Sequence, residues 1–362
     1  MKYNTNVHTQ TLLVNGISYS KTKLPEASTP EMTELHDFLL NWFNDDLFIT
    51  VHTSGSTGTP KEMKVKKEQM MNSACATCRY FNLNPNDRVL LCMPLTYIAG
   101  KMMVVRALVG KLNLHVVSVS GHPLANISLP IRFAAMIPLQ VYNSLQDSIE
   151  RNRIENINII ILGGRRIDPG LEKELKIFRN SIYVSYGMTE TLSHIALRKI
   201  NGIDASQHYI PLPSVKVSLS SDETLIIDAP LVCENKLITN DIAVIYSDGS
   251  FDILGRKDNI VNTGGIKIQI ELLEEELKPI IPHPFAISSV PDLKYGEALV
   301  LLVNGKIDEE AFLFKIKKSL PTYQIPKQII EVDEIPYTST GKINRAATKI
   351  LAQKQIDYSK LT

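Results

Sequence analysis

Short apolar runs alternate with helical patterns in the first half of this chain, and this alternation is the strongest constraint on its fold. The strand-like runs are residues 88–93, 114–119, 157–162 and 182–184. The helical patterns are residues 101–109, 135–149 and 169–178. The run 157–162 is almost entirely β-branched, as is typical of a strand covered on both faces. Strands that alternate with helices predict an α/β fold, in layers around a largely parallel sheet.

The N-terminal residues carry weaker signals. Residues 1–28 are polar and mixed, and we expect them to form a peripheral lead-in. Thr29 followed by Pro30 predicts the N-cap and first position of a helix. An apolar run over 47–51 predicts a strand beside this helix, and that strand leads into a segment rich in glycine and hydroxyl groups.

The pattern changes twice towards the C-terminus. Residues from about 197 to 257 contain short strand-like runs broken by turn residues, which predicts a β-rich subdomain. Residues 258–362 mix strand-like and helical runs, which predicts a small α+β domain. We therefore expect a core domain over 1–257 and a C-terminal domain over 258–362.

Composition excludes several classes of function. The formal net charge is +1, which argues against a nucleic-acid-binding surface. Apolar runs are too short for membrane insertion, and the N-terminus lacks the apolar core of a signal peptide. Four cysteines in 362 residues do not suggest a disulfide framework, so we expect a cytoplasmic protein. Cys75 and Cys78 form a single Cys-x-x-Cys pair, and we expect both to be buried in a helix.

The segment 53–61 predicts a phosphate-binding loop. Glycines let the backbone approach a phosphate, while hydroxyl, amide and ammonium groups donate to its oxygens. The candidate ligands are Thr53, Ser54, Gly55, Ser56, Thr57, Gly58 and Lys61. The segment is not a Walker A motif, because Pro60 precedes the lysine and Glu62 follows it. Taken alone, it is equally well explained as a solvated turn.

Five further features suit a nucleotide site. An aromatic ring, a hydroxyl and a carboxylate lie close together in 186–190, after an expected strand. A carboxylate such as Asp241 accepts hydrogen bonds from ribose hydroxyls, and Arg256 and Lys342 can reach phosphate or ribose. Gly163 and Gly164 follow another strand and would let adenine approach the backbone. Each motif alone is also explained as a surface turn.

Together and in this order, the motifs resemble those of the adenylate-forming superfamily, which includes acyl- and aryl-CoA synthetases, adenylation domains and luciferases. The resemblance runs from about residue 48 to 346. It implies that the phosphate loop, Gly163, Gly164, Tyr186, Gly187, Asp241 and Arg256 bind ATP. It also implies that Lys342, Thr189 and Glu190 are catalytic, with Glu190 as the Mg²⁺ ligand.

Within the superfamily, three segments resemble the o-succinylbenzoate–CoA ligase family of menaquinone biosynthesis. These segments are residues 93–100, residues 187–194 and Arg106, which lies nine residues after Tyr97. The resemblance implies that Arg106, Tyr97 and Ser193 contact the acyl substrate, with Arg106 at a substrate carboxylate.

The chain departs from this pattern in three places. Tyr97 replaces the usual histidine, and Asn240 replaces the usual glycine before Asp241. The phosphate loop also begins much earlier than in full-length relatives, so we expect a missing or reduced N-terminal subdomain.

The resemblance implies a two-step reaction with ATP, Mg²⁺, coenzyme A and a small carboxylic acid. The acid first attacks the α-phosphate of ATP, and the thiol of coenzyme A then attacks the resulting acyl-adenylate. The C-terminal domain is implied to be mobile and to rotate about Asp258 between the steps. After rotation, Gly264 and Gly265 would line part of the coenzyme A tunnel.

Several alternatives remain open at this stage. The main expectation is an o-succinylbenzoate–CoA ligase; the alternatives are a CoA ligase for another acid, an adenylation enzyme that loads a carrier protein, and a non-catalytic relative that binds nucleotide. Both a monomer and a homodimer agree with the sequence.

Overall fold

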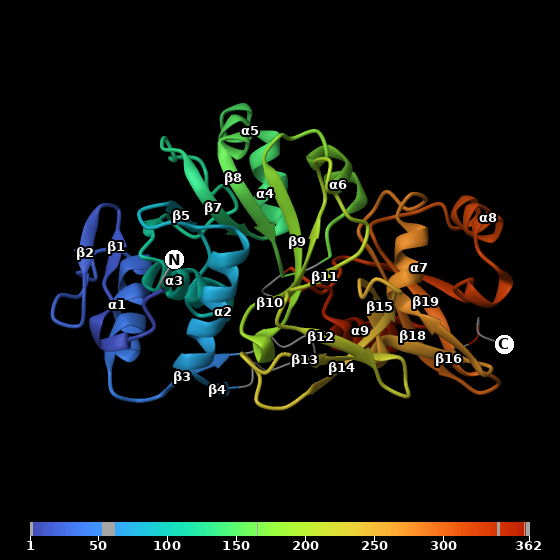
Figure 1. The fold of residues 1–362 in the computed structure, drawn as a ribbon. Helices are drawn as coiled ribbons and strands as arrows, with labels where there is room; N and C mark the ends of the chain where they lie inside the picture. The colour runs from blue at the N-terminus through green and yellow to red at the C-terminus, as the bar shows by residue number, and fades with distance from the viewer. Residues whose placement is uncertain (1–2, 53–61, 165, 339–340, 358, 360–362) are drawn as a thin grey trace.

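The computed structural model describes residues 3–52, 62–164, 166–338, 341–357 and 359. Figure 1 shows the N-terminal elements at one end of the molecule, the large sheet in the middle and the C-terminal elements at the other end. The β-rich segment lies between the large sheet and the C-terminal elements. No described helix is long and apolar enough to cross a membrane.

The large sheet has the strand order β11-β10-β9-β8-β7-β5-β6-β1-β2. Its strands are β1 Leu12–Val14, β2 Ile17–Tyr19, β5 Arg88–Leu91, β6 Asn113–Val116, β7 Ile131–Met136, β8 Ile157–Leu162, β9 Ser181–Gly187, β10 His194–Lys199 and β11 Ile210–Pro211. Pairing is parallel from β1 to β9 and antiparallel at both edges of the sheet. The predicted α/β fold with a largely parallel sheet is confirmed.

Helices cover both faces of this sheet (Figure 1). These helices are α1 Pro30–Phe43, α2 Lys67–Tyr80, α3 Ile98–Gly110, α4 Pro138–Gln146, α5 Ser148–Glu155 and α6 Pro169–Leu175. Helices α1, α2 and α3 share one hydrophobic cluster with alternate strand residues, and α4, α5 and α6 share another on the opposite face. The predicted cap of α1 is present, because the hydroxyl of Thr29 accepts a hydrogen bond from the Met32 amide over 3.2 Å.

The sequence-based prediction of a helix over 135–149 is wrong at its start. Strand β7 extends to Met136, and α4 begins at Pro138. Ala135 and Met136 pair with Ile161 and Leu162 of β8, so they complete the interior of a parallel sheet. Apolar residues at these positions satisfy helical spacing as well as a buried strand, and tertiary pairing decides between the two.

The N-terminal lead-in is less peripheral than expected. Leu12 is fully buried and Val14 nearly so, and Leu13 pairs in parallel with Asn113 of β6. Residues 12–19 therefore supply the last two strands at one edge of the large sheet. Polar residues around this short apolar run concealed its role, because a strand of three residues gives no clear period.

Two smaller sheets complete the core region. The arms of the predicted phosphate loop, β3 Phe48–His52 and β4 Glu62–Lys66, form an antiparallel hairpin apart from the large sheet. The predicted β-rich segment forms an antiparallel sheet of β12 Lys216–Leu219, β13 Thr224–Asp228, β14 Leu237–Ile245 and β15 Phe251–Arg256. A hydrophobic cluster around Phe251 and Ile195 packs this sheet against β10.

The C-terminal elements form a separate sheet. Its strands are β16 Ile260–Thr263, β17 Ile266–Gln269, β18 Phe285–Asp292, β19 Gly296–Asn304 and β20 Gln328–Val332. The helices here are α7 Ile270–Leu277, α8 Glu309–Ser319 and α9 Arg345–Gln355. Two hydrophobic clusters made from residues after 260 lie on its two faces. We call residues 260–356 the C-terminal module.

Candidate active site

A tight turn ends strand β9 at the centre of the candidate site. Gly187 lies so close to the next strand that a Cβ atom there would be 2.3 Å from the Ser193 carbonyl oxygen. The Thr191 hydroxyl donates a hydrogen bond to that carbonyl over 2.8 Å and accepts one from the Met188 amide over 3.0 Å. The turn therefore needs glycine at 187, and it leaves the predicted metal ligand Glu190 exposed.

Tyr186, Asp241 and Arg256 form one hydrogen-bonded group. The Tyr186 hydroxyl donates to one carboxylate oxygen of Asp241 over 2.6 Å, and the Arg256 guanidinium donates to the other over 3.2 Å. Asp241 is buried, at 8% exposure. Burial and the neighbouring carboxylate both raise the pKa of Tyr186, so its hydroxyl keeps its proton and remains a donor. The sequence predicted these residues as ATP ligands but not their mutual contacts.

The ring of Tyr186 packs in an aromatic cluster. Its centroid lies 5.4 Å from that of Phe251 and 5.9 Å from that of Tyr209. Neither neighbour was a candidate from the sequence, although Phe251 begins a predicted strand. The cluster restricts the tyrosine ring that we expect to face adenine.

Lys342 reaches this group from the C-terminal module. Burial lowers the pKa of its ammonium, while Asp241 raises that pKa and Arg256 lowers it. The charges of Asp241 and Arg256 therefore act on the ammonium of Lys342. From the sequence alone Lys342 was equally a solvated turn residue. The structure instead brings together groups that are about a hundred positions apart in the chain.

Arg106 is a buried cation without a carboxylate partner in the described part of the chain. Its side chain, in α3, is 2% exposed, donates to the Ser193 hydroxyl and lies 6.0 Å from the Phe133 ring centroid. Its Nε atom has no hydrogen-bond partner among the described residues. Burial lowers the pKa of Arg106 to about 10, so the group is still charged at neutral pH.

His194 lies on the other side of Ser193. Its Nδ1 is 3.2 Å from the Ser193 hydroxyl and its Nε2 is 3.3 Å from the Thr77 hydroxyl. Burial, together with the charge of Arg106, lowers the pKa of His194 to about 3. The imidazole is therefore neutral at pH 7 and adds no second positive charge beside Arg106.

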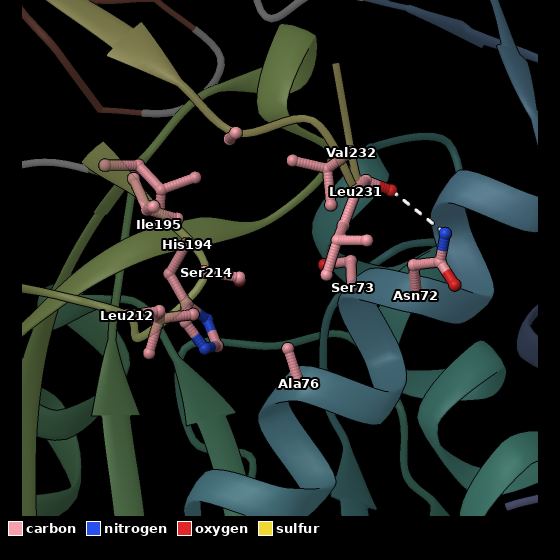
Figure 2. A pocket seen from close by; sticks show the side chains of 11 residues that line it. Asn72, Ser73, Ala76, His194, Ile195, Leu212, Ser214, Leu231 and Val232 are labelled. Atoms are coloured by element: carbon pink, nitrogen blue, oxygen red, sulfur yellow. Dashed lines mark hydrogen bonds between the residues drawn. The ribbon is translucent and has the colours of Figure 1, made fainter. Parts of the chain in front are cut away.

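Figure 2 shows a small pocket beside this histidine, between α2, strand β10 and the loops before β12 and after β13. Ser73 and Ala76 of α2 face His194 and Leu212 across it. The Asn72 amide donates to the Leu231 carbonyl over 3.1 Å at its rim. This contact connects α2 to the loop after β13.

That loop also connects the arms of the predicted phosphate loop to the turn after β9. Lys66 of β4 forms an ion pair with Glu234, and the Cys233 thiol donates to the Glu190 carbonyl over 3.2 Å. His52 of β3 forms a β-bridge with Tyr97. The phosphate-loop candidates from Thr53 to Gly58, and Lys61, lie outside the described residues.

The two glycine pairs lie in different parts of the molecule. Gly163 follows β8, where an added Cβ would be 3.0 Å from the Ser185 hydroxyl, and Gly164 has a φ of +90°. These residues lie one strand away from Tyr186. Gly264 and Gly265 form the turn between β16 and β17, where the Gly264 amide donates to the Tyr295 carbonyl within the C-terminal module.

The polar side chains of the candidate site suit a Mg²⁺ ion bound together with a nucleotide better than a metal ion held by protein ligands alone. No group of three or more His, Cys, Asp or Glu suited to a metal occurs among the described residues. Mg²⁺ in nucleotide sites usually takes one or two carboxylates and completes its shell with phosphates and water. An exposed carboxylate at Glu190, beside the arms of the phosphate loop, suits that arrangement. The four cysteines are free.

The chain is similar to known acyl-CoA ligases. A 2-succinylbenzoate–CoA ligase from Lactococcus lactis is 25% identical over 328 residues, covering 84% of this chain and 71% of the relative. An acyl-CoA synthetase (AMP-forming)/AMP-acid ligase II-like protein from Dyadobacter fermentans is 32% identical, with a TM-score of 0.62, covering 91% of this chain and 96% of that structure.

A third similarity concerns the fold alone. The o-succinylbenzoate CoA synthetase from Bacillus subtilis, solved with its acyl-adenylate intermediate, is 20% identical with a TM-score of 0.68, over 82% of this chain and 67% of its own. The family model described as AMP-binding enzyme matches residues 5–233, which is more than half of the chain. This match includes β9, the turn at Glu190 and Arg106, and the chain belongs to the AMP-binding enzyme family.

Proposed function

We propose that the protein is an AMP-forming acid–CoA ligase and that its acyl substrate is o-succinylbenzoate. The family and its similarity to 2-succinylbenzoate–CoA ligases support the reaction type. The buried guanidinium of Arg106, which has no carboxylate partner among the described residues, carries the substrate assignment. An isolated buried charge is costly, so a ligand with a carboxylate beyond the one being activated would complete this site.

In the first half-reaction, one carboxylate oxygen of the acid attacks the α-phosphorus of ATP, and the bond to the bridging oxygen of pyrophosphate breaks. A carboxylate is a weak nucleophile, so the protein contributes position and positive charge. We assign Lys342 to the α-phosphate and the attacking carboxylate. Thr189 and the loop residues Thr53 to Gly58, with Lys61, would bind phosphate oxygens. Magnesium bound at Glu190 would offset the phosphate charge.

The nucleoside half of ATP has its own candidate residues. Asp241 and Arg256 would bind the ribose, since Asp241 is held in place by Tyr186 and Arg256. Gly163, Gly164, Tyr186 and Gly187 would form the adenine side. We expect Tyr97 and Ser193 to contact the acyl group. The Ser193 hydroxyl accepts a hydrogen bond from Arg106, and Tyr97 forms a β-bridge with His52 at the end of β3.

In the second half-reaction, the thiolate of coenzyme A attacks the acyl carbon and AMP leaves. We propose that the chain divides into a core over 1–257 and a mobile domain over 258–362, which pivots at Asp258. Separate hydrophobic clusters on either side of residue 258 support this division. Rotation would withdraw Lys342 and bring Gly264 and Gly265 to the coenzyme A path.

The decisive test is ATP–pyrophosphate exchange with a panel of carboxylic acids, followed by detection of the CoA thioester. We expect exchange with o-succinylbenzoate and thioester formation when coenzyme A is added. Exchange with a different acid only would overturn the substrate assignment. Absence of exchange with every acid would favour a non-catalytic nucleotide-binding relative. Exchange without a CoA thioester would favour a carrier-loading enzyme.

Arg106→Ala tests the substrate carboxylate contact. Loss of a buried charge-assisted hydrogen bond typically costs about 1.5–3 kcal/mol, so we expect KM for o-succinylbenzoate to rise roughly 10- to 150-fold. The KM for ATP should change by less than about 3-fold. Equal increases in both KM values would show that Arg106 supports the fold and not the acid.

We also propose where the protein is found in the cell and how many copies associate in solution. A cytoplasmic location agrees with four free cysteines, which are usual in a reducing compartment. A homodimer is a further expectation, which light scattering of the purified protein tests.

A further inference from the structure

The candidate hinge residue Asp258 is held by two donors from the core. Arg256 donates to one carboxylate oxygen over 2.7 Å. The Asn240 side-chain amide lies 3.1 and 3.2 Å from the two carboxylate oxygens. Asn240 precedes Asp241 on β14, and Asp241 pairs in register with Arg256 on β15. The hinge carboxylate is therefore attached directly to the strands that carry the proposed ribose site.

A second contact joins the C-terminal module to strand β15. The Gln269 amide donates to the Arg256 carbonyl over 3.0 Å. The Gln269 side chain lies so close to Gly255 that a Cβ atom at 255 would be 2.1 Å from the amide nitrogen. The Lys278 ammonium, just after α7, lies 3.8 Å from the carboxylate of Asp168, just before α6. These contacts and the position of Lys342 near Asp241 belong to one orientation of the module.

We propose that Asn240 is a positioning residue that stabilises this orientation by binding the carboxylate of Asp258. Rotation about the Asp258 backbone moves its Cβ atom and takes the carboxylate away from the Asn240 amide. The hydrogen bond therefore favours the orientation that presents Lys342, at the expense of the orientation used by coenzyme A. This inference rests on the proposed function and identifies a role for a residue outside the predicted site.

Asn240 supplies the side chain that reaches Asp258. The superfamily pattern has glycine before the ribose aspartate, and glycine has no side chain that could reach Asp258. Both Asn240 and Asp258 are exposed, so the bond is screened by water and its effect is modest. A net hydrogen bond of this kind shifts a two-state equilibrium by roughly 3- to 10-fold.

The test compares Asn240→Ala with Asn235→Ala, an exposed asparagine just before β14. We expect Asn240→Ala to slow single-turnover adenylate formation roughly 3- to 10-fold, while thioester formation from supplied acyl-adenylate stays equal or becomes faster. Asn235→Ala should change neither step. Asn240→Asp places a negative charge beside Asp258, so it should slow adenylation at least as much as Asn240→Ala.

Hydrogen–deuterium exchange on the unliganded protein measures the orientation without catalysis. We expect Asn240→Ala to increase amide exchange around residues 256–271, which contain the Gln269–Arg256 contact, and Asn235→Ala to leave it unchanged. Equal slowing of both half-reactions, or unchanged exchange in Asn240→Ala, would overturn the role of Asn240. If the unaltered protein activates no acid, the proposed function fails, and the exchange data still decide whether Asn240 holds the hinge.

Discussion

At the level of single residues, the proposed site depends on charges whose environment the fold controls. Lys342 is partly buried and has both an attractive neighbour, Asp241, and a repulsive one, Arg256. Arg106 is buried beside a histidine that stays neutral at pH 7. Each cation is thus placed where a negatively charged substrate group would stabilise it, and each can be tested separately.

Lys342→Ala should separate the two half-reactions. Removing one preorganised donor to a developing charge typically costs about 10²–10³ in rate, so we expect adenylate formation to fall by that factor. Thioester formation from supplied acyl-adenylate should be retained, because Lys342 would be withdrawn in that step. Equal losses in single-turnover assays of both steps would contradict the assignment.

The rate of adenylation should fall at high pH because of Lys342. Burial lowers its pKa below the ordinary lysine value of 10.5, and a lowered pKa means that the charged form is lost earlier as pH rises. Adenylation should therefore be maximal below this pKa and decline through it. In a pH profile of ATP–pyrophosphate exchange, Lys342→Arg should shift the decline upwards, since a guanidinium keeps its charge. An unchanged profile would assign the decline to another group.

Tyr186→Phe removes the donor to Asp241 without changing the aromatic packing. The buried carboxylate then loses a hydrogen bond, which typically costs about 1–3 kcal/mol. We expect KM for ATP to rise roughly 5- to 100-fold, with a smaller effect on KM for the acid. Tyr142→Phe, at an exposed position on α4, serves as the matched control and should leave both KM values unchanged.

At the level of elements, helix α9 positions the segment that carries Lys342. Arg345 at its start forms two hydrogen bonds of 2.7 Å with Glu274 of α7. Glu274 is buried and also accepts the Ile287 amide over 2.9 Å. The Asn344 side chain caps the helix by accepting the Ala347 amide over 3.1 Å. The loop before α9 is therefore attached at its C-terminal end to the interior of the module.

Arg345→Ala should destabilise the C-terminal module. It leaves the buried Glu274 carboxylate without its cation, and breaking such a pair costs about 3–5 kcal/mol when both groups are fully buried. Arg345 is partly exposed, so we expect a loss of about 2–3 kcal/mol in chemical denaturation. The control Lys349→Ala, which removes an exposed ion pair on the same helix, should cost less than about 1 kcal/mol.

At the level of the whole molecule, the proposed reaction requires two arrangements of two folded parts. In the described orientation the charges of Asp241 and Arg256 act on Lys342, while the Gly264 amide donates to Tyr295 of its own module. The proposed second half-reaction therefore calls for another orientation of the module. The narrow connection at residues 256–260 is where we expect the change.

Asp258→Pro tests this pivot. Proline holds φ near −65°, so we expect the variant to retain one half-reaction and lose most of the other. The same single-turnover assays used for Lys342→Ala report which orientation is kept. Normal rates in both steps would place the pivot elsewhere in the connection.

Some helices and strands could be predicted from the sequence, and others could not. The alternation in the first half and the turn-broken strands after residue 197 predicted the sheet classes, because side-chain periodicity is a local property. Strand β7 was misassigned, since Ala135 and Met136 suit helix and buried strand equally. The strand β1 was missed, because three residues carry too little pattern.

The sequence by itself determined the α/β class, the order of the nucleotide-binding motifs and the candidate residues, since these depend on residue type and spacing. Only the tertiary structure decided which groups meet. Among the described residues, it exposed Lys342 to the charge of Asp241, left the buried Arg106 without a carboxylate and joined Asn240 to Asp258. These contacts connect distant segments, and their energies depend on burial and distance, which the order of residues along the chain does not specify.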